Sequence, residues 1–534
     1  MLVNPEAWIA HDPDPTTAAE LAALDPDELA ARFANPLTFG TAGLRGPVRG
    51  GPDAMNVAVV LRATWALAQV LLDRADKQAT TVIVGRDARH GSAAFAKAAA
   101  EAIAAQGFSV LLFPEPVPTP VVAFAVRHTG AAAGIQITAS HNPATDNGYK
   151  VYLDGGVQIV SPTDRSIEAA MAVAPPADEI PRLPVEPSKT GTETDADLVE
   201  LYLQRAAGLR RGTGSVRVAL TPMHGVGGAL AVGTLRQAGF DDVHTVATQF
   251  APDPDFPSIA FPNPEEPGAT DALLALAAEV GADVAIALDP DADRCAVGIP
   301  GPSGWRMLSG DETGWLLGDY ILSQAASGTR TVASSIVSSR MLAEIAAYYG
   351  ALHVETLTGF KWLARADADQ PGTLVYAYEE AIGHCVDPHA VRDKDGISAA
   401  VLVCDLVATL AGQGRTVPDA LDDLAHRHGV HEVAAVPRRV GGPDDAAALM
   451  RRIREAPPDR LAGFTATATD ITAALVFTGG DDETSIRVIV RPSGTEPKVK
   501  FYLEVRCAVT DDLGPVRDRA RALRETLVCA IRHW

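Results

Sequence analysis

One order of apolar and polar segments occurs three times along this chain. Each copy has an apolar run rich in β-branched residues, a small polar loop, an alanine-rich segment with helical periodicity, a glycine and a second apolar run. The glycine stands where the C-terminus of a helix commonly carries one. Each copy therefore predicts a β-α-β unit. The copies lie at residues 80–113, 215–246 and 329–357.

The segments that follow the three copies also share a pattern. In each, a glycine begins an apolar strand that ends in a polar loop, at residues 130–143, 281–294 and 372–384. Ligands of open α/β sheets bind in the crevice beyond the carboxyl ends of the strands. We therefore expect three related domains that present three equivalent loops to one cleft. The alternative is three independent α/β domains whose loops are ordinary surface connections.

The pattern changes after about residue 430. Strand-like segments occupy residues 466–480 and 485–509, and the Gly/Asp cluster at 479–483 predicts a hairpin turn between them. A helical segment at 516–534 follows. These features predict a smaller α+β domain at the C-terminal end.

The predicted fold class is α/β, with three related α/β domains with mixed sheets plus a smaller C-terminal α+β domain, arranged around one cleft. A chain of 534 residues is too long for a single core, which agrees with several domains. The predicted boundaries are 1–208 for domain I, 209–312 for domain II, 313–428 for domain III and 429–534 for domain IV.

Composition and charge narrow the function. Hydrophobic residues make up 47% and charged residues 21%, as in an ordinary soluble globular protein. The net charge of −22 argues against nucleic acid or an anionic membrane as a partner. If the substrate is an anion, a few local Arg and Lys residues must overcome this unfavourable field.

The missing signal-peptide pattern and the small, odd number of cysteines predict a cytoplasmic protein. The first residues do not show the pattern of a signal peptide. The most apolar long segment, 271–288, is interrupted by Glu279 and Asp283, so no membrane span is predicted. The five cysteines are odd in number and form no CxxC pair, which indicates a reduced protein.

The segment DPDADR carries three carboxylates, at Asp289, Asp291 and Asp293. Alternate residues of an extended segment face the same way, so the three side chains can converge on one hard cation. Oxygen-only ligands favour Mg²⁺ over zinc or iron and leave part of its octahedron for a phosphate oxygen. Spacing excludes an EF-hand, since its glycine position is Arg294 and its glutamate position is Pro300. The alternative is a solvated acidic turn.

The segment RPSGTEPK, which begins at Arg491, has the composition of an anion site. The backbone N–H groups of Ser493, Gly494 and Thr495 can form a nest, with Arg491 as a bidentate clamp for a phosphate. Ser493 and Glu496 also have the spacing of a capping box. The strand-like alternation that follows leaves no helix to cap, which favours phosphate binding.

Two further glycine-rich segments give weaker signals. Residues 38–51 hold Arg45, but such a loop is as often a turn as a phosphate site. The segment GRDARHGS, at 85–92, is explained equally well as the strand-to-helix turn of the first β-α-β unit.

The segment TASHNPATDNGYK, at 138–150, is the densest in reactive side chains. Ser140 has three interpretations: a turn serine, the nucleophile of a Ser-His-Asp hydrolase, or a carrier of a phosphoryl group. A hydrolase elbow of the GxSxG type is missing from the sequence. The carboxylate loop, the phosphate nest and the basic residues favour phosphoryl transfer. Mg²⁺ would then balance the charge of a phosphoserine, while His141 and Lys150 handle protons or developing charge.

TASHNPATDNGYK, DPDADR, EEAIGH and RPSGTEPK resemble, in order, the four signature loops of the α-D-phosphohexomutase superfamily, and the resemblance spans essentially the whole chain. It implies that domains I to IV carry the phosphoserine, metal, sugar-recognition and phosphate-binding loops. It also implies a phosphoserine at Ser140, and Mg²⁺ bound by Asp289, Asp291, Asp293 and the phosphate on Ser140. The implied mechanism passes a phosphoryl group to the sugar phosphate, reorients a sugar bisphosphate and returns the other phosphate to Ser140, with a sugar 1,6-bisphosphate as activator.

The resemblance also implies roles for other residues. Arg45, His141 and Lys150 belong to the catalytic loop, and Arg294 belongs to the metal loop. The remaining implied substrate-binding residues are Thr358, Gly359, Lys361, Glu380, His384, Lys394, Arg491, Ser493, Gly494 and Thr495.

The sugar-recognition segment departs from the pattern Glu-x-Ser-Gly-His, because Ile382 stands at the serine position and has no hydroxyl to bond a sugar oxygen. Glu380 and His384 would then recognise the sugar. With FGTAGLRG, this form looks like the branch that holds phosphopentomutase and glucose-1,6-bisphosphate synthase enzymes, and it is similar to actinobacterial proteins called phosphomannomutase.

We therefore expect a phosphosugar mutase that interconverts sugar 1-phosphate and sugar 6-phosphate, with glucose and/or mannose as the sugar. Phosphopentomutase is the alternative. A phosphatase or a sugar-phosphate-binding regulator is more distant, because a phosphatase typically needs a two-metal His/Asp cluster and a regulator needs neither Ser140 nor the acidic triad. The expected partners are small-molecule sugar phosphates, and the expected state is a monomer or dimer.

Overall fold

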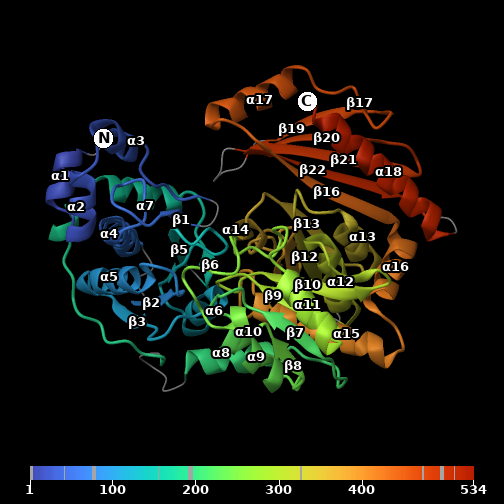
Figure 1. The fold of residues 1–534 in the computed structure, drawn as a ribbon, viewed down its shortest axis with the longest axis horizontal. Helices are drawn as coiled ribbons and strands as arrows, with labels where there is room; N and C mark the ends of the chain where they lie inside the picture. Colours follow the sequence, from blue (N-terminus) through green and yellow to red (C-terminus); the bar gives the residue numbers. More distant parts are fainter. Residues whose placement is uncertain are drawn as a thin grey trace. The chain divides into compact units, whose positions relative to one another are not determined.

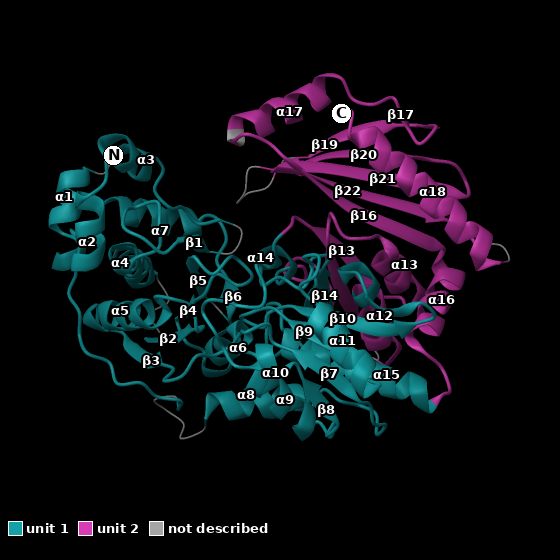
Figure 2. Cartoon of the chain, in the orientation of Figure 1, with its two compact units in different colours: residues 1–313, 359–365, 375–412 teal, residues 314–358, 366–374, 413–534 magenta. Residues whose placement is uncertain are grey.

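The computed structural model describes residues 4–40, 43–74, 80–153, 155–190, 197–324, 328–471, 474–492, 498–509 and 512–534. They form two compact units (Figure 2). Unit 1 comprises residues 1–313, 359–365 and 375–412, and unit 2 comprises residues 314–358, 366–374 and 413–534. The four domain boundaries drawn from the sequence stay predictions.

The three β-α-β units predicted from the sequence are confirmed (Figure 1). In each, the two strands pair in parallel. Each helix is followed by a glycine in the left-handed region, at Gly107, Gly239 and Gly350. The units are β2 (Thr81–Arg86), α5 (Ser92–Ala105) and β3 (Ser109–Leu112); β7 (Val218–Thr221), α9 (Gly228–Gln237) and β8 (Val243–Thr245); β12 (Arg330–Ser335), α13 (Met341–Tyr348) and β13 (Leu352–Thr356).

The three polar loops connect the strands of antiparallel hairpins. The hairpins are β4 (Ala133–Ile137) with β5 (Asp146–Leu153), β9 (Val284–Leu288) with β10 (Cys295–Gly301), and β14 (Thr373–Glu379) with β15 (Gly383–Cys385). In addition, β4 pairs in parallel with β2, and β9 with β7, so these sheets are mixed as predicted. We call the connections the serine loop (residues 138–145), the metal loop (289–294) and the sugar loop (380–382).

Unit 1 contains two complete mixed sheets. Their strand orders are β1-β5-β4-β2-β3, with β6 paired to β5, and β11-β10-β9-β7-β8. The added strands are β1 (Leu44–Pro47), β6 (Val157–Gln158) and β11 (Gly304–Met307). The other helices of unit 1 are α1 (Pro5–Ala10), α2 (Pro15–Ala22), α3 (Pro26–Ala34), α4 (Val57–Asp73), α6 (Thr119–Thr129), α7 (Thr163–Ala172), α8 (Leu198–Ala207), α10 (Ala247–Phe250), α11 (Asp271–Val280), α14 (Phe360–Leu363) and α15 (Gly396–Gly412).

The two faces of the first sheet are packed differently. Val82 and Val84 of β2 belong to a core cluster with α4 and α5. On the opposite face, glycines allow α6 to approach the strands closely, because a Cβ at Gly134 would lie 2.4 Å from the Cγ2 atom of Val126. The N-terminus of α6 lies near the carboxyl ends of the strands, where the polar loops begin, since the N–H of Val117 donates to the carbonyl oxygen of Arg86 at 2.8 Å.

Unit 2 contains an antiparallel five-stranded sheet in the order β16-β22-β21-β20-β19. The predicted turn at 479–483 is confirmed, since β20 and β21 pair as a hairpin across it. The strands are β16 (Val430–Arg439), β19 (Thr467–Ile471), β20 (Ala474–Gly480), β21 (Thr484–Pro492) and β22 (Lys498–Cys507); the helices are α16 (Val417–His428), α17 (Pro443–Glu455) and α18 (Leu513–Ile531). A small hairpin joins β17 (Arg460–Leu461) to β18 (Phe464–Thr465), and α12 (Gly310–Gln324) begins in unit 1 and continues into unit 2.

No single helix among the described residues is long and apolar enough to cross a membrane, and α15 and α16 pass that test only when they are taken together. Most of α15 is buried within the protein.

Candidate active site

The metal loop gathers three buried carboxylates. Oxygen atoms of Asp289, Asp291 and Asp293 all lie within 4.8 Å of one another. The loop is a turn and not the extended segment assumed from the sequence, since Ala292 has φ +53° and its N–H donates to the carbonyl oxygen of Asp289 at 2.8 Å. The left-handed residue between Asp291 and Asp293 is what lets the side chains converge.

The serine loop contacts this acidic cluster directly. The Oγ of Ser140 donates a hydrogen bond of 2.7 Å to Oδ2 of Asp289 and lies 3.2 Å from Nδ1 of His141. Ser140 has φ +52°, and its N–H donates to Oγ1 of Thr138 at 2.9 Å. The predicted convergence of the serine and metal loops is therefore observed within unit 1.

Lys150 and Thr119 donate hydrogen bonds to the carboxylates of the cluster. The Nζ of Lys150, on β5, donates to Oδ2 of Asp291 at 2.7 Å and to Oδ2 of Asp293 at 2.8 Å. Thr119, at the start of α6, donates from Oγ1 to Oδ2 of Asp291 at 2.5 Å and from its N–H to the Asp291 carbonyl at 3.0 Å. Sequence reasoning missed Thr119, since its proline-rich surroundings give no chemical signal.

Lys394 reaches the same cluster from the segment before α15. Its Nζ lies 3.2 Å from Oδ2 of Asp293 and 3.6 Å from Oδ1 of Asp393. Asp393 in turn accepts hydrogen bonds from the hydroxyl of Tyr152 at 2.8 Å and from Nε2 of Gln158 at 2.6 Å. Strands β5 and β6 therefore fix the carboxylate beside Lys394, a support that the sequence did not reveal.

The sugar loop is attached to the end of the metal loop through backbone contacts. Arg294 forms an isolated β-bridge with Gly383, and the N–H of Cys295 donates to the carbonyl oxygen of Ile382 at 3.0 Å. The Arg294 guanidinium lies 3.6 Å from Glu265 and 4.0 Å from Asp293, both looser than a normal hydrogen bond. It is therefore oriented toward the cluster without being tightly bound to it.

Arg45 lies on β1, beside the serine loop. Its Nη1 donates to Oδ1 of Asn142 at 3.3 Å. Burial lowers the pKa of this guanidinium, while Asp291 and Asp293 oppose the change. Its proximity to the serine loop agrees with the residue set expected from the sequence.

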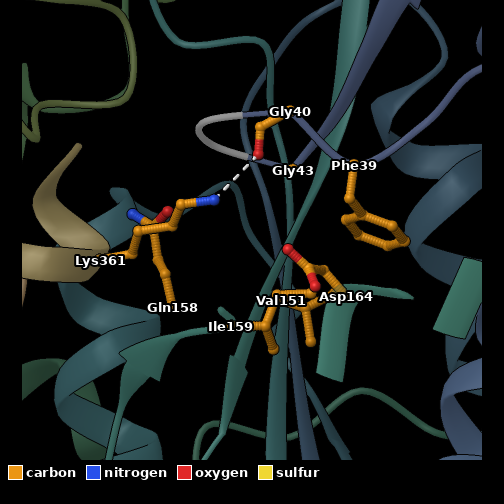
Figure 3. A pocket seen from close by; sticks show the side chains of 8 residues that line it. All are labelled: Phe39, Gly40, Gly43, Val151, Gln158, Ile159, Asp164 and Lys361. Carbon is orange, nitrogen blue, oxygen red and sulfur yellow. Dashed lines mark hydrogen bonds between the residues drawn. The ribbon is translucent and has the colours of Figure 1, made fainter. Parts of the chain in front are cut away.

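Lys361 lies in a neighbouring pocket that encloses about 240 Å³, part of it open solvent (Figure 3). Its Nζ points at the carbonyl oxygen of Gly40, 3.4 Å away. Burial lowers the pKa of Lys361, and Asp164 opposes this effect. The pocket is lined by Phe39, Gly40, Gly43, Val151, Gln158, Ile159, Asp164 and Lys361.

The charges of the cluster are divided unequally. Burial, together with Asp291 and Asp293, raises the pKa of Asp289 well above its usual value. Burial also acts to raise the pKa of Asp293, but the cations of Lys150, Lys394 and Arg294 outweigh it and lower this pKa. Burial and the nearby cations of Arg294 and Arg45 lower the pKa of His141, so its imidazole is neutral at neutral pH.

The acidic cluster has the donor set of a hard divalent cation. Oδ1 of Asp291 and Oδ1 of Asp293 are buried, and within the described part of the chain no hydrogen-bond donor reaches either. A buried carboxylate oxygen without a partner is costly unless a cation satisfies it. Oxygen-only donors at this spacing suit Mg²⁺ or Ca²⁺ better than a softer metal. The three aspartates are therefore a candidate metal site.

The side chain of His384 is buried among aromatic residues, and its expected contact with a sugar oxygen stays a prediction. Its side chain is 0% exposed, its Nδ1 lies 3.0 Å from the hydroxyl of Tyr376, and its ring stacks against Tyr376 and Tyr378. Burial lowers the pKa of His384 to about 3, so it stays neutral. Enclosed by aromatic rings, the imidazole packs in the interior.

The side chain of Ile382 is buried in the protein interior, whereas the sequence predicted that it faces the sugar. The residue is 2% exposed and packs in a core cluster that includes Met223, Ala287 and Ala296. Its φ is +54°, which is uncommon for a β-branched residue. The turn directs the side chain into the apolar interior, so the missing hydroxyl does not leave a gap at the sugar.

The other expected residues lie as follows. Glu380 begins the sugar loop and is half-buried, and the N–H of Gly359 donates to Oε1 of Glu379 at 2.9 Å. Thr358 and Arg491 belong to unit 2, where both are half-buried. Arg491 lies near the end of β21, and its backbone is opposite that of Lys500 on β22. Ser493, Gly494 and Thr495 lie outside the described residues.

Comparison with protein families accounts for most of the chain. Four models match in order: the phosphoglucomutase/phosphomannomutase alpha/beta/alpha domain I at residues 36–175, domain II at 200–301, domain III at 309–428, and the C-terminal domain at 450–511. The chain belongs to the phosphoglucomutase/phosphomannomutase family. It is a phosphosugar mutase, an isomerase that transfers phosphate between positions of a sugar.

Relatives of this mutase carry different sugar names. A Haemophilus influenzae protein named "Probable phosphomannomutase" is 40% identical over 469 residues, covering 85% of this chain and 93% of that protein. The human phosphopentomutase is 33% identical, covering 95% of this chain and 92% of its own. A Staphylococcus aureus phosphoglucomutase is 32% identical, and the match covers 90% of this chain and 92% of that protein. The names agree on the reaction class and differ on the sugar.

The fold of this mutase is found among solved structures. The crystal structure of a phosphoglucomutase/phosphomannomutase family protein from Burkholderia thailandensis matches with a TM-score of 0.68 and 20% identity, covering 91% of this chain and 97% of that chain. At this identity the likeness shows the fold alone.

Proposed function

We propose that the protein interconverts sugar 1-phosphate and sugar 6-phosphate, with glucose and/or mannose as the sugar, through a phosphoserine at Ser140 and a sugar bisphosphate intermediate. The observation that carries the proposal is the hydrogen bond of 2.7 Å between Ser140 Oγ and Asp289 Oδ2, inside a buried acidic cluster. A serine that carries a phosphoryl group needs its negative charge balanced at this place, and a divalent cation in the acidic cluster would supply that balance. The similarity to a protein named phosphomannomutase supports a hexose.

In each half-reaction a phosphoryl group moves between Ser140 and a sugar oxygen. The Oγ–P bond of the phosphoserine breaks, a P–O bond forms to a sugar hydroxyl, and the hydroxyl proton passes to a nearby base. The bisphosphate then turns by half, and its other phosphate returns to Ser140. A sugar 1,6-bisphosphate primes the enzyme by phosphorylating an unmodified Ser140.

Asp289, Asp291 and Asp293, with the phosphate on Ser140, are proposed to hold Mg²⁺. The fit rests on the partnerless carboxylate oxygens and the oxygen-only donor set. When bound, the cation supplies Lewis-acid charge stabilisation to the phosphoryl group.

His141 and Lys150 are proposed to manage protons and charge around Ser140. His141 is neutral because burial lowers its pKa, and its Nδ1 lies 3.2 Å from Ser140 Oγ, so it is placed to exchange a proton there. The ammonium of Lys150 lies between Asp291 and Asp293 and offsets their charge. Lys394 adds a second cation beside Asp293.

Substrate recognition is proposed to use residues from several loops. Arg45 lies beside the serine loop and Arg294 is the last residue of the metal loop, so both suit the transferring phosphate. Arg491, with the nest of Ser493, Gly494 and Thr495, is proposed to hold the phosphate that is not transferred. Thr358, Gly359, Lys361, Glu380 and His384 are proposed to contact the sugar.

Phosphopentomutase is the second candidate function. Relatives named phosphopentomutase match 95% of the chain at 33% identity. Ile382 has no hydroxyl and its side chain packs in an apolar core, so this position supplies no polar contact that would favour a hexose. Turnover of ribose 1-phosphate beside the hexose phosphates would favour this alternative.

The decisive experiment uses glucose 1-phosphate or mannose 1-phosphate with a trace of the matching 1,6-bisphosphate and Mg²⁺. Appearance of the 6-phosphate is expected. Release of inorganic phosphate would instead indicate a phosphatase, and binding without turnover would indicate a regulator. Ribose 1-phosphate and deoxyribose 1-phosphate are tested in parallel, and the ratio of kcat/KM values assigns the sugar.

A further inference from the structure

We propose that Arg89 is a positioning residue that holds the serine loop in the conformation in which Ser140 meets the acidic cluster. The inference rests on the proposed role of Ser140. Arg89 belongs to the turn between β2 and α5, a segment whose weak signal in the sequence is explained equally well by an ordinary strand-to-helix connection.

The Arg89 guanidinium binds the serine loop through its carbonyl oxygens. Nη2 donates to the carbonyls of Ser140 at 2.5 Å and Asn142 at 2.7 Å. Nη1 donates to those of Pro143 at 2.7 Å and Asp146 at 3.2 Å. The planar guanidinium thus spans the loop from the reactive serine to the first residue of β5. A lysine ammonium could not reproduce this pattern, because it presents its donors from one point.

Arg89 is itself fixed by its own turn. Its Nε lies 3.3 Å from Oδ2 of Asp87, and its N–H donates to Oδ1 of Asp87 at 3.0 Å. Asp87 also accepts a hydrogen bond of 2.5 Å from Oγ of Ser92. Asn147 extends the connection to β5, with Nδ2 donating to the His90 carbonyl at 2.8 Å. The guanidinium is therefore aimed at the serine loop by a buried carboxylate.

Phe256, in the segment before α11, packs against the guanidinium of Arg89. Arg89 Cζ lies 4.9 Å from the ring centroid of Phe256, which is buried and has φ +45°. The neighbouring Asp255 contacts Nε2 of His90 at 2.7 Å. An aromatic face against a guanidinium restricts its tilt and adds a cation–π attraction. The ring thus restricts the direction in which Arg89 presents its donors.

The conformation of Ser140 explains why such a support is needed. Ser140 has φ +52°, a region that residues with a Cβ avoid, and it persists only where the surroundings enforce it. The bond from Arg89 Nη2 to the Ser140 carbonyl fixes the peptide plane that follows this residue. Freed from it, the loop would relax and move Oγ away from Asp289, whose distance of 2.7 Å defines the site.

The chain offers a matched control in Arg32. This arginine is 7% exposed, close to the 4% of Arg89, and its guanidinium bonds Glu20, Glu28 and the carbonyl of Gly50. None of these partners belongs to the serine, metal or sugar loop. Arg32→Lys therefore reports the cost of losing a buried guanidinium without disturbing Ser140.

The first test compares Arg89→Lys with Arg32→Lys in steady-state kinetics, with thermal unfolding recorded for both. We expect Arg89→Lys to lower kcat by about 100-fold with little change in KM, because a small displacement of a reacting group costs about this much. Arg32→Lys should keep wild-type kcat at temperatures where it is folded. Equal kcat in Arg89→Lys and Arg32→Lys, at matched folded fraction, would overturn the proposal.

The second test does not depend on turnover. Hydrogen–deuterium exchange of the peptide covering residues 138–147 is measured in wild type, Arg89→Lys, Phe256→Leu and Arg32→Lys. We expect faster exchange of this peptide in Arg89→Lys, a smaller increase in Phe256→Leu and no change in Arg32→Lys. Unchanged exchange in Arg89→Lys overturns the positioning role even if activity is lost. If wild type turns over no sugar phosphate, the proposed function fails, while the exchange data still decide whether Arg89 holds the loop.

Discussion

The serine loop and the sugar loop occupy the same place in two related parts of the fold and are used differently. Each joins the strands of an antiparallel hairpin that follows a β-α-β unit. Each also has a non-glycine residue in the left-handed region, Ser140 at φ +52° and Ile382 at φ +54°. Ser140 directs its hydroxyl to Asp289, whereas Ile382 directs its side chain into an apolar core.

The comparison separates what a turn determines from what a side chain determines. In both loops the left-handed residue reverses the chain sharply, so that neighbouring backbone groups reach another loop. In the serine loop the residue at that point also does chemistry, and in the sugar loop it packs while its carbonyl accepts from Cys295. The metal loop is intermediate, since Ala292 at φ +53° carries no reactive group and orients Asp291 and Asp293 on either side.

The largest difference between the two loops is expected for Ser140→Ala. Turnover should fall by several orders of magnitude, since the covalent carrier is lost. Intact-mass measurement after incubation with the bisphosphate should show one phosphate on wild type and none on the variant. Ser303→Ala, in the exposed turn between β10 and β11, is the control and should match wild type. Equal phosphate occupancy in Ser140→Ala would remove this serine from the mechanism.

The metal loop should give a comparable loss. Excess EDTA should abolish turnover and Mg²⁺ should restore it, and Asp291→Asn should reduce activity in the same range, because the proposed ligand set loses a charge. Asp283→Asn, at an exposed position before β9, should keep wild-type activity. Full activity in excess EDTA would show that the acidic cluster works without a cation.

A smaller effect, on stability and not on sugar choice, is expected for Ile382→Ser. Truncating a buried isoleucine costs about 2–5 kcal/mol of unfolding free energy, and a buried hydroxyl without a partner adds to this cost. Ile382→Val should cost only about 0.5–1.5 kcal/mol. Urea unfolding measures both variants, and the ratio of kcat/KM for hexose and pentose phosphates should not change. A shift of that ratio toward hexoses in Ile382→Ser would mean that the side chain does reach the sugar.

Much of the fold and part of the site could be predicted from the sequence. The β-α-β units were visible because apolar runs and helical periodicity alternate with a C-cap glycine, as at Gly107 and Gly239. Ser140 and Asp289 were predicted to meet because both follow strands at equivalent places. The spacing of charged residues within one loop is local information, so the acidic triad could be read directly.

Other features depend on contacts between distant segments and left no local signal. Thr119, at the start of α6, binds Asp291 although the two residues are 172 positions apart in the sequence. The role of Arg89 depends on carbonyl oxygens more than 50 positions away in the sequence, and any strand-to-helix turn could contain an arginine. A motif shows residue types and not the side of a strand on which they lie, so the complete burial of His384 could not be read from the sequence.

The smallest expected effect tests the left-handed turn itself, through Ala292→Gly. Glycine relieves a backbone strain of about 1–2 kcal/mol at the φ of +53° found here. This gain offsets two losses: the buried methyl group, worth about 0.8 kcal/mol, and the greater entropy of glycine in the unfolded chain. The unfolding free energy should therefore stay within about 1 kcal/mol of wild type. Ala99→Gly, equally buried inside α5, lacks this relief and should cost about 1 kcal/mol more for its helical backbone. Urea unfolding of the two variants side by side measures the difference, and an equal loss in both would mean that the turn at Ala292 stores no strain.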